Sequence, residues 1–119
     1  MEKKIREVKT YLHYFDDFFG LQKPNVQKKI TFVLDYIENK VGLIPEKFLK
    51  HIQGSKGLYE VRVEVGSDIF RIFSFFDEGK LIVLVNGFQK KRQKTPKDEI
   101  KLAEKLMKDY FESKKTKKK

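Results

Sequence analysis

The chain of 119 residues contains no cysteine and only 2 histidines. Without cysteine it can form neither a disulfide bond nor a thiolate metal site. The histidines, His13 and His51, are far apart, and neither has another ligand at the spacing of a metal site. We therefore expect no metal and no cofactor.

Long apolar runs are also missing. No apolar segment reaches the ~18 residues of a membrane-spanning helix. Met1-Glu2-Lys3-Lys4 is not followed by the apolar region of a signal peptide. These absences predict a cytoplasmic protein. With 39% apolar residues, including 11 Phe and 5 Tyr, the chain has enough material for the core of one domain.

The net charge of +10 is unevenly distributed. Residues 89–119 hold 13 Lys and Arg against 5 Asp and Glu, whereas residues 1–88 hold 14 against 12. A local excess of this kind indicates nucleic acid or the ribosome as a partner. Part of it is a lysine-rich end, residues 114–119, which we expect to be a disordered tail after a single domain over residues 1–113.

Apolar periodicity predicts an α+β domain. The expected strands are residues 5–12, 58–65, 68–76 and 81–88, and the expected helices are residues 11–19, 24–40 and 96–113. Residues 43–57 are expected to be irregular, and Thr95 and Pro96 are typical of a helix start. We predict a mainly antiparallel, four-stranded twisted sheet, helices packed on one side of it, and a C-terminal helix.

The strands at 58–65 and 68–76 are joined by Gly66-Ser67, a pair suited to a two-residue turn. A symmetric turn places Arg62 directly opposite Arg71, on the same face as Glu60 and Glu64. Like charges in that position are destabilising. Two interpretations follow: the carboxylates neutralise the arginines in a surface ion network, or the arginines await a phosphate, which a guanidinium fits well.

A cationic segment follows the most apolar run, Leu81–Val85. Residues 86–96 contain Lys90, Lys91, Arg92 and Lys94 and no acid. A strand that ends in such a segment and is braced by a helix presents fixed positive charge to a polyanion.

Three short motifs occur in a recognisable order. They are Lys50-His51-Ile52-Gln53-Gly54-Ser55-Lys56-Gly57-Leu58-Tyr59-Glu60-Val61-Arg62, then Phe70-Arg71-Ile72-Phe73, then Gly87-Phe88-Gln89-Lys90-Lys91 with Lys94-Thr95-Pro96. In this order the chain resembles the RelE/ParE toxin superfamily of type II toxin–antitoxin systems, above all its phage-derived HigB-like branch. The resemblance covers about residues 5–111.

The resemblance implies a RelE-like domain and an endoribonuclease, an mRNA interferase that cuts messenger RNA on the ribosome with basic residues instead of a metal. It also implies a cognate helix-turn-helix antitoxin. The implied catalytic residues are Arg62, Arg71, Lys90, Lys91 and Glu60. We add His51, Lys56, Arg92 and Lys94 as candidate nucleic-acid-binding residues.

The expected reaction is attack of the RNA 2′-hydroxyl on the neighbouring phosphate, which needs a base, an acid and positive charge on the phosphorane. The arginines suit the last role, and Glu60 or a lysine crowded by cations suits proton transfer. Many relatives have a Tyr or His soon after the last strand; here a long helix takes that place, so base and acid stay unassigned. The alternative is a non-enzymatic basic protein that binds RNA or the ribosome, or inhibits gyrase as ParE does.

Overall fold

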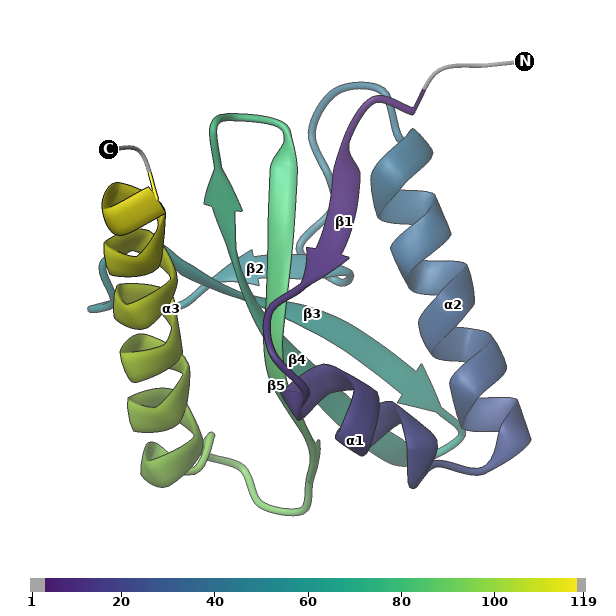
Figure 1. Cartoon of the computed structure of the whole chain (residues 1–119). Coiled ribbons are helices and arrows are strands. Elements are labelled where there is room, and N and C mark those ends of the chain that lie inside the picture. Colours follow the sequence, from purple (N-terminus) through teal and green to yellow (C-terminus); the bar gives the residue numbers. More distant parts are fainter. Residues whose placement is uncertain (1–3, 118–119) are drawn as a thin grey trace.

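Residues 4–117, which this computed structural model describes, form five strands and three helices (Figure 1). The strands are β1 Glu7–Thr10, β2 Leu49–His51, β3 Leu58–Val65, β4 Asp68–Asp77 and β5 Leu81–Lys90. The helices are α1 Tyr14–Gly20, α2 Pro24–Asn39 and α3 Lys97–Lys117. The strands make one sheet in the order β1-β5-β4-β3-β2.

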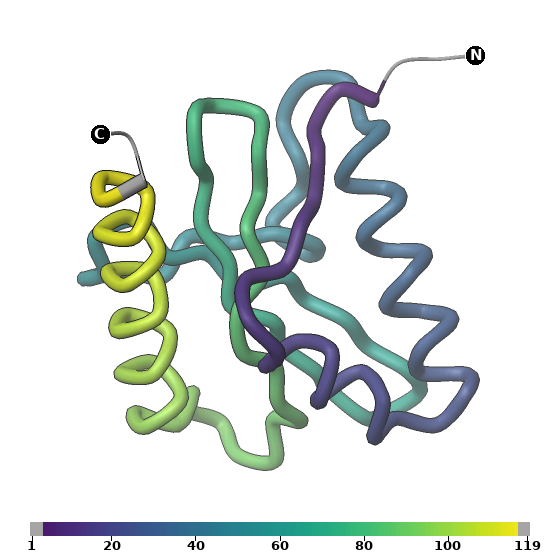
Figure 2. Tube along the Cα trace, in the orientation of Figure 1, coloured from purple at the N-terminus to yellow at the C-terminus, as the bar shows by residue number. Residues whose placement is uncertain are grey.

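The α+β class is confirmed, but the four-stranded antiparallel sheet was wrong. β1 runs parallel to β5, from Glu7 beside Leu81 to Thr10 beside Leu84, and Figure 2 shows this contact between distant parts of the chain. β2 lies within the segment expected to be irregular. It has only three residues, of which only Leu49 is buried, so it shows no usable alternation.

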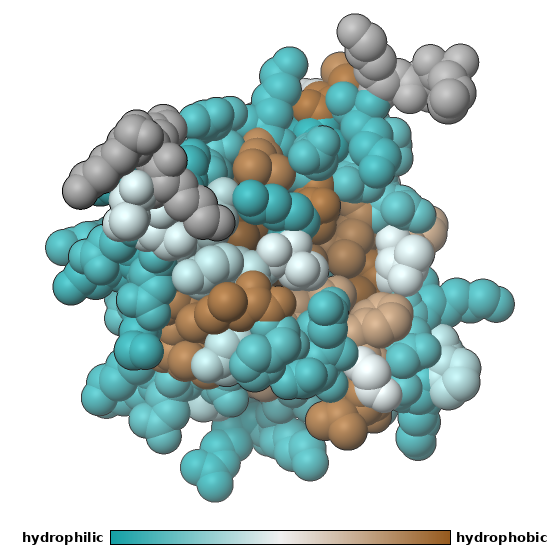
Figure 3. Space-filling view, in the orientation of Figure 1, coloured by the Kyte–Doolittle hydropathy of each residue, from teal (hydrophilic) through white to brown (hydrophobic). Residues whose placement is uncertain are grey.

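Helices cover both faces of the sheet, so the prediction that they pack on one side was also wrong. α1 and α2 pack on the face that carries Ile82 and Leu84, whereas α3 packs on the face that carries Val83 and Val85. The near-continuous apolar run of β5 results from burial on both sides. Apolar side chains reach the surface near the middle of the molecule, and hydrophilic side chains surround them (Figure 3).

The predicted β3–β4 hairpin and its register are confirmed. Gly66 has φ 61°, as a two-residue turn with glycine in first position requires, and Arg62 pairs with Arg71. Further along, the β4–β5 pairing shifts between Ile72 and Ser74. Asn86, beside this irregularity, donates from Nδ2 to the backbone O of Glu99 at 3.0 Å and so attaches the first turn of α3 to the sheet.

The predicted tail was wrong for residues 114–117, because α3 continues to Lys117. Lys114 Nζ lies 2.8 Å from Asp77 Oδ2, and the Tyr110 hydroxyl donates to the same oxygen at 2.6 Å. These contacts hold the helix against the β4–β5 turn. Residues 118–119 lie outside the described residues. None of the three helices in the described part is both long and apolar enough to cross a membrane.

Candidate nucleic-acid interface

Three charged side chains form a cluster on the α3 face of the sheet. Arg62 Nε lies 3.0 Å from Glu60 Oε2, and Arg71 Nε lies 3.4 Å from the same oxygen. The Arg71 side chain is only 4% exposed, whereas that of Arg62 is 26% exposed. Antiparallel pairing of β3 with β4 places the two arginines side by side, and the alternation of β3 places Glu60 on their face.

Glu60 therefore neutralises part of the charge, as the first interpretation of the hairpin expected. Glu64 lies on the same face and its charge also acts on Arg71, so two carboxylates balance the two guanidinium groups, and the net positive charge of this surface comes from the basic residues around them. Neither arginine Nε makes a hydrogen bond with acceptable geometry to any described residue, so the contact with Glu60 is electrostatic. An oxyanion that offers several oxygens is a better partner for two such forks than a single carboxylate.

Burial is the main cause that lowers the pKa of Arg71 from its ordinary value. The neighbouring charge of Arg62 lowers it further, while Glu60 and Glu64 act in the opposite direction. Arg71 Nη1 donates to the backbone O of Phe70 at 3.1 Å, which fixes the guanidinium in place. The Arg71 guanidinium is therefore a charge of fixed orientation beneath this surface.

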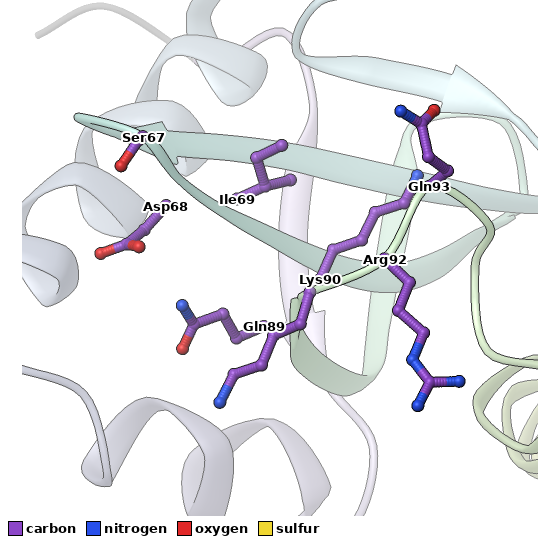
Figure 4. Close-up of a pocket in the computed structure, with 8 residues that line it drawn as sticks. Ser67, Asp68, Ile69, Gln89, Lys90, Arg92 and Gln93 are labelled. Atoms are coloured by element: carbon purple, nitrogen blue, oxygen red, sulfur yellow. The ribbon is translucent and has the colours of Figure 1, made fainter.

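The cationic segment adjoins this cluster. Lys90 pairs with Ile69, which is two positions from Arg71 along β4 and on the same face. Lys90, Lys91 and Arg92 line an open hollow of about 630 Å³. Figure 4 shows that its walls come from the β3–β4 turn and from the end of β5. Lys94 is exposed in the loop that follows but does not line the hollow.

Two of the predicted nucleic-acid-binding residues lie elsewhere. His51 pairs with Tyr59, and their rings meet edge to face at 5.2 Å, on the face opposite the arginines. Lys56 precedes Leu58, which pairs with Phe75, four positions from Arg71 along β4. The structure therefore does not bring His51 or Lys56 into the cluster.

Three other lysines were missed. Lys50 pairs with Glu60 across β2 and β3, so it shares the face of the arginines. Lys29 and Lys47 lie beside Arg62 at the edge of the sheet. Recognising β2 as a strand would have selected Lys50 over its neighbour His51, but no local pattern places Lys29 near Arg62.

No three His, Cys, Asp or Glu side chains among residues 4–117 are grouped as metal ligands would be. The chemistry that the described side chains offer at this surface is charge stabilisation by guanidinium and ammonium groups, with the carboxylate of Glu60 between the arginines.

Residues 17–108 match the family described as phage-derived Gp49-like proteins (DUF891). The chain belongs to this Gp49-like family. The family is part of the RelE/HigB-like toxin superfamily. The match covers α2, all of β2–β5 and the start of α3, and so includes every charged residue of the cluster and of the cationic segment. No curated protein matches the chain.

Proposed function

We propose that this Gp49-like protein is the toxin of a type II toxin–antitoxin system and cleaves messenger RNA, on the ribosome, through the surface formed by Arg62, Arg71 and the Lys90–Lys91 segment. The observation that carries the proposal is the pair of arginines held side by side on adjacent strands, with the Glu60 carboxylate near both, beside a cationic hollow. Family membership supports a toxin but leaves its chemistry open.

In the proposed reaction the 2′-oxygen of a ribose attacks the adjacent phosphorus while the bond to the 5′-oxygen breaks. A base takes the proton of the 2′-hydroxyl, and an acid gives a proton to the departing 5′-oxygen. The products are a 2′,3′-cyclic phosphate and a free 5′-hydroxyl. Atoms and charges balance without any further reagent.

The two arginines have different parts in this proposal. Arg62, at 26% exposure, meets the phosphate directly, whereas Arg71, at 4%, supplies fixed charge from behind it. Both stabilise the negative charge that develops on the phosphorane. Glu60, beside both, is the carboxylate placed to accept a proton, and Lys90 and Lys91 are the ammonium groups placed to give one.

A second candidate is a protein that binds RNA or gyrase without cutting RNA. The observation that favours it is the ion network itself, since Glu60 already pairs with both arginines. It predicts growth arrest with an intact transcript pool, and with gyrase-linked DNA damage if gyrase is the target.

The test is expression from an inducible promoter, with growth and transcript integrity followed together. Wild type is expected to arrest growth and to yield transcripts with new 5′-hydroxyl ends. Arg62→Ala and Lys91→Ala should reduce cleavage by translating ribosomes about 100- to 1000-fold, the loss typical of one removed charge-stabilising group. Lys108→Ala, an exposed lysine on α3, is the matched control and should stay fully active.

Full cleavage by both Arg62→Ala and Lys91→Ala would refute the proposed active site. Growth arrest with intact transcripts would instead support the second candidate, a protein that binds RNA or gyrase without cutting RNA. The proposed system also includes a small helix-turn-helix antitoxin that binds this toxin in the cytoplasm. Co-expression of the product of a neighbouring gene should then restore growth, and failure of every adjacent gene to do so would contradict that partner.

A further inference from the structure

A separate groove of about 220 Å³ lies at the edge of the sheet, where β3 continues past the end of β2. It is lined by Lys29 and Val33 of α2, by Lys47 and Phe48 from the segment before β2, and by Arg62 and Glu64 of β3. The Arg62 backbone N–H donates to the Phe48 carbonyl at 2.8 Å, which fixes this segment beside the strand.

Three cations reach this groove from three different parts of the chain, alongside the carboxylate of Glu64. Within residues 4–117, neither Lys29 nor Lys47 forms an ion pair. Lys29 Nζ lies 5.5 Å from the ring centre of Phe32, and Lys47 Nζ lies 5.0 Å from that of Phe48. An aromatic ring orients a cation without cancelling its charge, so the groove stays positive.

Arg62 connects this groove with the arginine cluster. Its Nε lies 3.0 Å from Glu60 Oε2, and its Nη1 lies 3.5 Å from the Glu46 backbone O, next to Lys47. One guanidinium therefore spans from Glu60 to the edge groove. The groove and the cluster therefore share one side chain, that of Arg62.

We infer that the groove binds a backbone phosphate of the same RNA strand, next to the phosphate bound by Arg62. The inference rests on the proposed function. Lysine and arginine side chains that contact phosphates set the position of a strand without reading its bases. Lys29 and Lys47 would thus decide which phosphodiester lies at the arginines, as positioning residues.

The experiment measures binding of a 2′-O-methyl RNA oligonucleotide, which lacks the nucleophile and cannot be cut, by fluorescence anisotropy at several salt concentrations. The variant is Lys29→Ala/Lys47→Ala. Loss of one phosphate contact should weaken binding and make the plot of log affinity against log salt shallower by about 0.7, the value for single strands.

The matched control is Lys28→Ala/Lys108→Ala, which removes the same net charge. Lys28 is adjacent to Lys29 but lines a different hollow, on the outer side of α2, and Lys108 is exposed on α3. This control should keep the wild-type salt slope. Circular dichroism checks that all variants are folded.

Equal salt slopes for the two double variants would refute the inference that the groove binds a phosphate. If the groove variant binds the oligonucleotide normally but sediments less with ribosomes, the lysines contact ribosomal RNA and the inference also fails. If the expected slope change appears while wild type leaves messenger RNA on translating ribosomes intact, the groove stands and the nuclease proposal fails. Absence of oligonucleotide binding by wild type would refute the groove, whereas the nuclease proposal depends on the cleavage assay with translating ribosomes.

Discussion

Gly87 lies where β5 approaches Phe18 of α1 closely, and Gly87→Ala tests this packing. A Cβ at Gly87 would lie 2.6 Å from Cδ2, 2.9 Å from Cε2 and 2.9 Å from Cγ of the Phe18 ring. Phe18 is only 8% exposed, and its ring packs against Phe70 at 6.4 Å between centroids. Because Cγ is among the close atoms, rotation of the ring about its own axis cannot relieve the contact.

Overpacking of this kind costs about 1–3 kcal/mol. Alanine recovers roughly 0.4–1 kcal/mol by restricting the unfolded chain, because Gly87 does not have a positive φ. We therefore expect a net loss of about 1–2 kcal/mol. For a chain of 119 residues this lowers the melting temperature by roughly 4–8 °C. Thermal unfolding and urea titration, followed by circular dichroism, measure both quantities.

Gly20→Ala is the control, since no described atom lies within 4 Å of the added Cβ and no positive φ is required there. It should be neutral or stabilising. A double-mutant cycle with Phe18→Leu should show that the smaller side chain reduces the cost of Gly87→Ala by at least about 0.5 kcal/mol. An unchanged or raised melting temperature for Gly87→Ala would refute the packing of α1 on β5.

Other predictions concern the buried charges. Tyr110→Phe removes the hydrogen bond to Asp77 and should lower the free energy of unfolding by about 1.5–3 kcal/mol, measured by urea titration; no change would contradict the 2.6 Å contact. Burial alone would raise the pKa of Asp77, but hydrogen bonds from Lys114 and Tyr110 lower it below its ordinary 3.8. Its contribution to stability is therefore present above about pH 3.8 and lost as the pH falls through the lowered value. In an Asp77→Asn variant the free energy of unfolding should lose this dependence on acid pH. An unaltered dependence would contradict the lowered pKa of Asp77. Glu60→Ala removes the nearest carboxylate from the buried Arg71 and should cost about 3–5 kcal/mol, whereas equal stability to wild type would show that the ion network is not formed.

The arginine pair could be predicted because it depends on local rules. Gly66-Ser67 determines the turn, the turn determines the register, and a period of two then places Arg62 and Arg71 on one face. The helix Pro24–Asn39 followed equally from its own apolar spacing. In each case the residues that specify the structure are close together in the sequence.

The features that were missed depend on partners distant in the sequence. Lys114 lies in a lysine-rich segment whose composition is typical of a solvated tail. Only its contact with Asp77 explains why α3 includes it. His51 was chosen as a histidine in a loop, but the pairing of β2 with β3 places Lys50 on the face of the arginines instead. The last helix was expected to begin at Pro96, but α3 begins at Lys97, and its Ile100 N–H donates to the Pro96 carbonyl.

The parallel contact of β1 with β5 has a consequence for how the protein is assembled. Glu7 joins Leu81, so the first strand of the chain can be placed only after the last strand exists. Bringing β1 and β5 together closes a long loop of chain, and the entropic cost of that closure comes before the β1–β5 contacts can offset it. We therefore expect this pairing to form late and slowly. Until then the edge of β5 at Leu81–Leu84 is open to pairing with another chain.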